Sequence, residues 1–255
     1  MQDLLFLFFK RKAMSEIHIK NISKTYISDF KRVKKKAVED VTLDIDSGEI
    51  LGIIGRNGAG KSTIIKMIMG FIRPDKGDII IDGKTPLDPD SRLNVGYLPE
   101  NPYFYDNLSA EELLKFSSYA SGLDKKSAEK RIKILLEKVG LYSVRQQKLR
   151  VYSKGMTQRA GISFALVHDP AIIILDEPMS GLDPFGRKMV IDLIKDLKKS
   201  GKTVLFCSHI LNDVERICDR VAIMDSGKLK GIFTKQEILE NSGMEELFLN
   251  IVKGK

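Results

Sequence analysis

The first third of the chain carries three β-strand patterns. Residues 16–22 and 41–45 alternate apolar and polar side chains, which predicts strands with one face toward a core. After a turn at Ser47-Gly48, residues 50–54 form a continuous apolar run. A run of that kind is typical of a strand buried on both faces of a mixed or parallel sheet.

Further strand and helix patterns follow along the chain. An apolar helix is expected after residue 62, ending near Gly70 and ahead of Pro74. Short strands are predicted at residues 78–81, 94–98, 171–175, 203–207, 221–224 and 229–233. The last two flank Asp225-Ser226-Gly227-Lys228, a hairpin turn pattern. Helices at residues 235–240 and 244–252 close the chain.

Helical patterns dominate from about residue 101. Ser109-Ala110-Glu111-Glu112 is a capping box, in which hydroxyl and carboxylate each satisfy a free amide at a helix start. Residues 125–139 place apolar side chains on one helix face and end at Gly140. We therefore expect one domain over residues 16–255, with a helical subdomain inserted at about 101–165. Residues 1–15 are expected to form an N-terminal extension without fixed structure.

Composition narrows the class of protein only a little. The chain has 255 residues, 43% apolar and 30% charged, which is ordinary for a globular protein with one large core or two modest ones. Its net charge of +8 suits a phosphate ligand, a membrane leaflet or nucleic acid, without choosing among them. Cys207 and Cys218 lack metal-ligand spacing and are expected to be reduced core thiols of a cytosolic protein.

The apolar run at residues 4–9 is the strongest candidate for a membrane segment. It is far shorter than the ~20 residues that a spanning helix needs. Its basic residues 10–12 follow the run, whereas a signal peptide carries its charges first. The run is either a small membrane-surface anchor or, as we favour, part of an extension upstream of a true start at Met14.

A phosphate-binding loop follows the buried strand at residues 50–54 and opens a helix. Its pattern is G-x-x-x-x-G-K-S, and we expect the loop and the next residue to bind nucleotide: Gly55, Arg56, Asn57, Gly58, Ala59, Gly60, Lys61, Ser62 and Thr63. Glycines let backbone amides surround phosphate oxygens, and the helix N-terminus adds its positive end. Lys61 should reach the terminal phosphates, and the Ser62 hydroxyl should bind Mg²⁺.

A carboxylate pair ends the apolar strand at residues 171–175. Strand alternation should send the side chains of Asp176 and Glu177 in different directions. We assign Asp176 to the Mg²⁺ ion and Glu177 to general-base or water-positioning work. The alternative, a charged turn after a strand, loses weight beside a phosphate loop.

With Tyr152-Ser153-Lys154-Gly155-Met156, these motifs resemble those of an ATP-binding-cassette (ABC) ATPase over about residues 16–230. The resemblance implies an α/β P-loop NTPase fold, with a RecA-like core, an antiparallel β subdomain and the inserted helical subdomain. The family's usual form of this signature loop is Leu-Ser-Gly-Gly-Gln, of which Ser153 and Gly155 are retained. The resemblance implies that they contact the terminal phosphate of ATP held by the opposite subunit. An apparent helix at residues 158–167 follows, and its N-terminus offers a second anion site.

The resemblance implies roles for four further residues. Asp183, in Ser-Gly-Leu-Asp, matches the loop that connects paired subunits. His209 matches the switch histidine that contacts the terminal phosphate, although an isolated histidine there is usually structural. Tyr26 matches the aromatic residue that stacks on adenine; the alternative is an ordinary aromatic at a strand end. Glu100 stands where the family usually has glutamine, and a carboxylate can still bind Mg²⁺.

These motifs predict the ATP-hydrolysing subunit of an ABC transporter, with ATP and Mg²⁺ as cofactors. The resemblance implies two cassettes closing on two ATP molecules, whether as a homodimer or with a paralogue. It also implies separate transmembrane permease subunits, so the chain would lie peripherally at the cytoplasmic face of the membrane. The signature and Glu100 resemble those of exporters. A rival reading, a soluble ABC ATPase on nucleic acid or ribosomes, usually involves fused cassettes or a long coiled coil. A binding-only cassette would need a lost base, and Glu177 is intact.

The aromatic residues 103–105 follow Glu100 directly. The resemblance implies a groove here for a short helix of the membrane subunit, and packing inside the helical subdomain is an equally weighted alternative.

Overall fold

The computed structural model describes residues 15–27 and 34–253 of the chain. The apolar run at 4–9, the proposed start at Met14 and nearly all of the predicted extension therefore lie outside the described residues. Across the described ranges, six strands form the larger sheet, in the order β5-β6-β7-β3-β8-β9. They are β3 (Ile50–Ile54), β5 (Val95–Leu98), β6 (Ile172–Asp176), β7 (Thr203–Ser208), β8 (Arg220–Asp225) and β9 (Lys228–Thr234). All pair in parallel except β9, which forms the predicted hairpin with β8.

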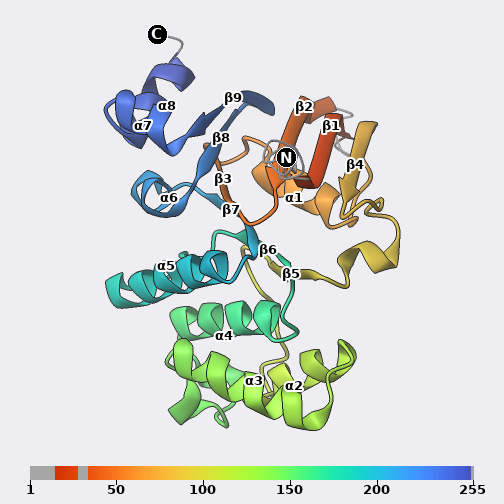
Figure 1. The fold of residues 1–255 in the computed structure, drawn as a ribbon, viewed down its shortest axis with the longest axis vertical. Coiled ribbons are helices and arrows are strands. Elements are labelled where there is room, and N and C mark those ends of the chain that lie inside the picture. Colours follow the sequence, from red (N-terminus) through yellow and green to blue (C-terminus); the bar gives the residue numbers. More distant parts are fainter. Residues whose placement is uncertain (1–14, 28–33, 254–255) are drawn as a thin grey trace, which may run out of the picture.

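A separate antiparallel sheet has the order β2-β1-β4 (Figure 1). Its strands are β1 (Ser15–Ile27), β2 (Lys34–Asp46) and β4 (Lys76–Ile81). β1 and β2 are much longer than the alternating segments suggested. Their pairing contains register shifts, and Asn21 and Asp40 have positive φ angles of 51°. Such bulges interrupt the two-residue period of side chains, so the alternation of apolar and polar residues ends before the strand itself ends.

Helix α1 (Lys61–Ile68) packs between the two sheets. Its apolar face joins one core with the inner side of the antiparallel sheet and one face of the larger sheet. The central strand β3 contributes to two cores, because Leu51 and Ile53 enter this one while Ile50 and Ile54 enter the other. The continuous apolar run therefore is a strand covered on both faces, as predicted.

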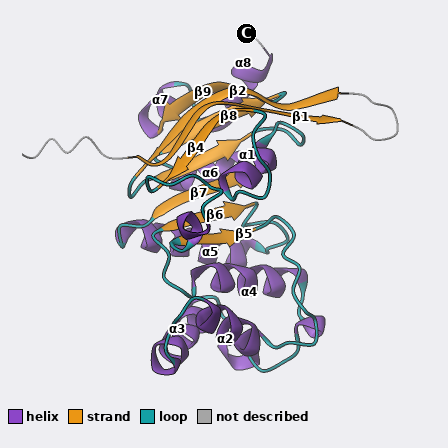
Figure 2. Cartoon of the chain, turned by 90° about the vertical axis from the view of Figure 1, so that its right-hand side faces the viewer, coloured by secondary structure: helices purple, strands orange, loops and turns teal. Residues whose placement is uncertain are grey.

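The other face of the larger sheet is covered by helices, with the helical lobe beyond them (Figure 2). The helices on this side are α4 (Lys154–Leu166), α5 (Pro184–Lys199), α6 (Leu211–Ile217), α7 (Lys235–Glu240) and α8 (Met244–Lys253). The lobe contains α2 (Ala110–Ala120) and α3 (Lys125–Lys138), which pack on α4. Short 3₁₀ turns occupy Pro89–Arg92, Tyr142–Val144 and Leu149–Val151. The predicted capping box at α2 is present, with Ser109 N–H donating to Glu112 Oε2 at 2.7 Å. The α/β fold with an antiparallel sheet and inserted helices is confirmed.

Helix α4 begins four residues earlier than expected, at Lys154 instead of residue 158. Ser153 is its N-cap, and its hydroxyl oxygen accepts a hydrogen bond from the Met156 N–H at 3.2 Å. The first turn lacks the apolar spacing that reveals a helix in sequence. Within residues 15–27 and 34–253, no helix is both long and apolar enough to cross a bilayer.

Candidate functional site

The carboxyl ends of four adjacent parallel strands bring the predicted site residues together. Strand register aligns Leu98 with Leu175, Asp176 with Cys207, and Ile54 with Ser208. The chain leaving these strands carries, in sheet order, Glu100, Glu177, His209 and the phosphate loop. In open α/β sheets this edge is where ligands bind.

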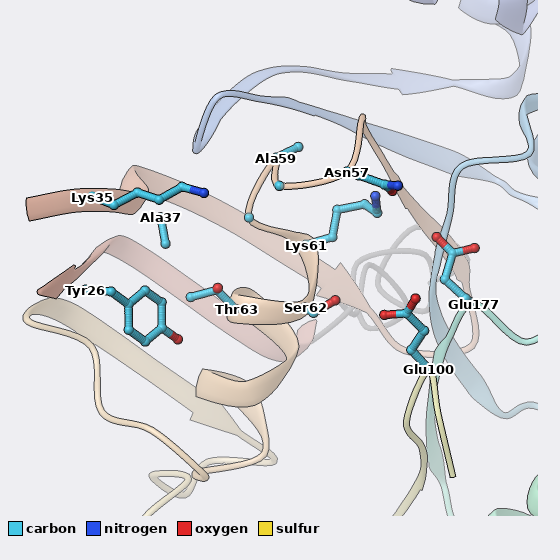
Figure 3. A pocket seen from close by; sticks show the side chains of 12 residues that line it. Tyr26, Lys35, Ala37, Asn57, Ala59, Lys61, Ser62, Thr63, Glu100 and Glu177 are labelled. Carbon is cyan, nitrogen blue, oxygen red and sulfur yellow. The ribbon is translucent and has the colours of Figure 1, made fainter. Parts of the chain in front are cut away.

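A cavity of about 320 Å³ opens at this edge, within the ~300–1,000 Å³ typical of small-molecule sites. Figure 3 shows the carboxylates of Glu100 and Glu177 on one side of Lys61. On the other side, Tyr26 and Lys35 border the cavity. Its lining residues are Tyr26, Lys35, Ala37, Asn57, Gly58, Ala59, Gly60, Lys61, Ser62, Thr63, Glu100 and Glu177.

The phosphate loop owes its shape to glycine and to contacts with two strands. Gly60 has a φ of 104°, and a Cβ atom there would lie 2.4 Å from the carbonyl oxygen of Ala37, so no other residue fits. Gly55 anchors the loop instead of lining the cavity, because a Cβ would lie 2.4 Å from Met224 O. Arg56 is exposed and also lies outside the lining set. The buried Lys61 ammonium donates to Gly55 O at 2.7 Å.

The carboxylate of Glu177 is oriented by the backbone of that residue and by a hydrogen bond with a histidine. Strand β6 ends at Asp176, and Glu177 has a left-handed φ of 51°. Its direction therefore comes from this turn, not from strand alternation as the sequence suggested. The Glu177 N–H donates to Cys207 O at 3.0 Å. Its Oε2 lies 2.9 Å from His209 Nδ1 in a hydrogen bond. A carboxylate held this way, facing the cavity, is well placed to accept a proton.

Asp176 is a buried carboxyl group with one oxygen that lacks a hydrogen-bond partner. Its side chain is nearly inaccessible, and its Oδ1 has no hydrogen-bond partner. Burial raises its pKa from 3.8 to about 6, with the charges of Glu100 and Glu177 adding to the rise. A hydrogen bond with Ser62 and the charge of Lys61 lower the pKa in part. An unpaired buried carboxylate oxygen beside a serine hydroxyl fits the chemistry of Mg²⁺, which prefers hard oxygen ligands.

Mg²⁺ would need more than the protein here. Among the described residues, no three His, Cys, Asp or Glu side chains gather as a metal site. The three predicted ligands, Ser62, Asp176 and Glu100, would leave an octahedral Mg²⁺ ion incomplete, and Mg²⁺ usually keeps waters and takes oxygens from bound phosphates.

The raised pKa of Asp176 predicts how the free energy of unfolding depends on pH. The folded protein binds this proton more tightly than the unfolded chain, so its stability falls as pH rises from about 4 to 6. Above that window the ionised carboxylate costs about 3 kcal/mol. We expect Asp176→Asn to stabilise the nucleotide-free protein by that order at pH 8, and the gain to vanish near pH 4. Urea unfolding at both pH values measures it; an equal gain at both would contradict burial of the charge as the cause.

The predicted site residues that do not line this cavity are Gly55, Arg56, Ser153, Gly155, Asp176, Asp183 and His209. Of these, Asp176 and His209 still contact lining residues, Ser62 and Glu177 respectively. Ser153 caps α4, and Gly155 packs on the neighbouring loop, where a Cβ would lie 3.2 Å from Gly181 O. Asp183 caps α5, its Oδ1 accepting from the Gly186 N–H at 2.7 Å. The signature and this loop thus touch each other and do not line their own chain's cavity.

Two lining residues were absent from the sequence prediction. Lys35 lies in a run of three lysines at residues 34–36, a pattern that is usually a solvated charge run, and Ala37 follows it. The strand register pairs Lys35 with Tyr26, so both reach the same cavity. Only knowledge of the antiparallel pairing of β1 with β2 could have revealed this. Both cysteines are buried free thiols, as expected.

Known proteins resemble this chain closely. The model of the family described as ABC transporter matches residues 38–180. The ATP-binding protein sll0415 of Synechocystis sp., described as belonging to an ABC transporter, is 43% identical over 89% of this chain, which spans 65% of that protein's length. The lantibiotic transport ATP-binding protein SrtF of Streptococcus pyogenes is 36% identical, covering 92% of this chain and 96% of its own.

A solved structure extends the likeness to three dimensions. The ATP-binding cassette MJ0796, solved as a dimer in a post-hydrolysis state with ADP and Pi, superposes with a TM-score of 0.79. It is 27% identical and covers 86% of this chain and 98% of its own. The family match spans more than half of the chain. It includes the phosphate loop and Glu177, which line one cavity, and Asp176, whose carboxyl is hydrogen-bonded with Ser62 of that lining. This chain is therefore an ATP-binding protein of the ABC transporter family.

Proposed function

We propose that this chain binds ATP with Mg²⁺ in the cavity at the carboxyl ends of β3, β5, β6 and β7 and hydrolyses it to drive a transporter. The observation that carries the proposal is the convergence of Lys61, Ser62, Glu100 and Glu177 on one cavity. Those side chains come from three separate segments of the chain. Convergence of a phosphate loop with a held carboxylate is what phosphoryl transfer to water requires.

Each group has a distinct task in the proposed reaction. The loop amides and Lys61 hold the phosphates, and Tyr26 offers an aromatic face for the adenine ring. Glu177 orients the attacking water and accepts its proton, while His209 restrains the carboxylate through their 2.9 Å hydrogen bond. When bound, Mg²⁺ neutralises phosphate charge; Ser62 and Asp176 would hold it.

Glu100 makes this Mg²⁺ site more negative than one with glutamine. Its carboxylate lines the cavity and contributes to the raised pKa of Asp176. We propose that Glu100 contributes an anionic oxygen near the metal, where glutamine would contribute a neutral one.

The proposed reaction takes place between two cassettes. Ser153 and Gly155 lie at the N-terminus of α4 and away from their own cavity, so they are free to complete the cavity of a second chain. Asp183 lies on the loop against Gly155 and is proposed to connect the two chains. The dimeric post-hydrolysis structure of the MJ0796 cassette supports this arrangement. Whether the second chain is a copy or a paralogue is left to experiment.

An apolar groove of about 520 Å³ supports a membrane partner. Its floor includes Phe104, whose ring stacks at a tilt 5.5 Å from that of Phe164. Its rim carries Tyr103 and Tyr105, which are 94% and 76% exposed. Both sequence alternatives therefore find support, since Phe104 packs inward and its two neighbours do not. We propose that a short apolar helix of a transmembrane subunit docks here.

We propose export as the direction and the cytoplasmic face of the membrane as the location. The relative SrtF is named for lantibiotic transport, and the exporter-like signature points the same way. The nucleic-acid alternative finds no support among these relatives, which are transporter proteins.

Purification of the tagged chain from its host membranes tests the proposal. We expect a hydrophobic membrane protein to copurify and the preparation to release phosphate from Mg²⁺-ATP. Copurification of RNA or DNA in its place would favour the rival function. Absence of phosphate release from the purified complex would rule out the ATPase.

A further inference from the structure

Gln158 is a buried polar residue that connects the signature helix to Glu177. It lies in the second turn of α4 and is only 3% exposed. Its side-chain Nε2 donates a hydrogen bond to the main-chain carbonyl oxygen of Glu177 at 3.2 Å. The bond spans two segments that are not otherwise neighbours in the chain, and it ends on the residue that carries the proposed proton acceptor.

The backbone of Glu177 has an unfavourable conformation that its surroundings must stabilise. Its φ of 51° lies in the left-handed region, which residues with a Cβ occupy sparsely unless their surroundings impose it. Three hydrogen bonds to the main chain of Glu177 impose it here. The Glu177 N–H donates to Cys207 O on β7. Its carbonyl oxygen accepts two hydrogen bonds, one from the Ser180 N–H at 3.0 Å within the turn and one from Gln158 on α4. Without Gln158, only the turn hydrogen bond from Ser180 orients this carbonyl, and the left-handed backbone that directs the carboxylate is held less firmly.

The neighbouring residue makes a contact of a different kind. Arg159 donates from Nη1 to Val139 O at 2.7 Å, tying α4 to the end of α3 in the helical lobe. The amide of Gln158 is thus not what attaches α4 to that lobe. The hydrogen bond of Gln158 instead connects α4 to Glu177, at the carboxyl end of strand β6.

We propose that Gln158 is a positioning residue for hydrolysis, which holds the main chain of Glu177 so that its carboxylate faces the reacting phosphate. The proposal rests on the proposed ATPase function. Because Ser153 caps the same helix five residues earlier, the bond also makes a short rigid path between the signature and Glu177 of one chain. A nucleotide contacted by the signature of one chain would thereby influence the carboxylate of that chain's own cavity.

The test replaces the amide in the full-length protein with an apolar group of similar shape, Gln158→Met. We expect kcat for ATP to fall by up to about 100-fold, the scale of a small misplacement of a reacting group. KM for ATP should stay within about twofold, since the cavity lining is unchanged. The matched control is Ser163→Ala on the same helix, which removes a buried hydroxyl that bonds to Arg159 O and does not contact the cavity.

A second variant keeps the polar shape of the side chain. In Gln158→Glu, an ionised carboxylate cannot donate to Glu177 O, whereas a protonated one can. The ratio of its kcat to that of the wild type should therefore recover as pH falls. A purely structural role for the residue would not produce this recovery.

The outcomes separate the inference from the function beneath it. An unchanged kcat in Gln158→Met, or a loss of kcat matched by Ser163→Ala, would overturn the role of Gln158. So would a rise in KM that accounts for the whole loss. A wild-type chain that does not hydrolyse ATP would contradict the proposed function itself, and the inference with it. Addition of Gln158→Met to Glu177→Gln should leave ATP-induced dimerisation intact; its loss would show that Gln158 acts on binding.

Discussion

Glu177→Gln should abolish ATP turnover and leave a stable ATP-bound dimer. The amide is nearly the same size as the carboxylate and leaves the main-chain hydrogen bonds of residue 177 unchanged. It cannot accept a proton from water, however, and removing a general base costs about 10²- to 10⁴-fold in rate. ATP then stays bound between the two chains, because its terminal phosphate, whose charge holds the chains together, is not cleaved off.

Phosphate release and light scattering measure the two halves of this expectation. Glu137→Gln, an exposed change on α3 whose carboxylate only meets Lys133 at 3.9 Å, is the matched control and should behave as wild type. An ATP-loaded Glu177→Gln protein that scatters light as a monomer would contradict the closed dimer. Turnover near the wild-type rate would remove Glu177 from the mechanism.

Ser153→Arg should also abolish hydrolysis, but by a different route. The long cationic side chain would obstruct the surface that α4 presents to the second chain. Loss of the serine N-cap costs only about 1 kcal/mol, too little to unfold the protein. Because Ser153 lies outside its own cavity, ATP binding by the monomer should be unchanged. Equal loss of monomer binding would show that the signature acts within one chain.

A mixing experiment tests the same point without relying on binding. Lys61→Ala inactivates the phosphate loop of its own chain, and Ser153→Arg inactivates the signature that it lends to the partner. Each homodimer then has two broken sites. A dimer with one chain of each kind has one site with both defects and one with neither. Mixing two inactive proteins should therefore restore activity, up to half of the wild-type rate in each mixed dimer. No recovery in dimers shown to be mixed would contradict the sharing of sites between chains.

The sequence alone was enough for the parts of this site that depend on local spacing. The loop from Gly55 to Ser62 was identifiable because its glycines, its lysine and the start of α1 are neighbours in the chain. Strand β3 was predicted with the bounds it has, because a strand covered on both faces must be apolar throughout. The strand before Asp176 was located for the same reason.

Tertiary structure decided whatever depends on partners far along the chain. The bulges at Asn21 and Asp40 hid the length of β1 and β2, and with it the place of Lys35 beside Tyr26. The apolar pattern did not show that α4 begins at Lys154, because its first turn has no apolar face to bury.

The geometry around Glu177 marks the division most clearly. Its identity as a candidate base could be read from the apolar strand that precedes it. Its left-handed backbone, its bond with His209 and its support by Gln158 could not, because each depends on how the strands and α4 lie in space. Hydrophobic periodicity specifies which face of a segment is buried, but not which segment lies beside it. Local motifs therefore identified the candidate catalytic residues. The order of the strands β5, β6, β7 and β3 decided where the side chains of these residues lie relative to one another.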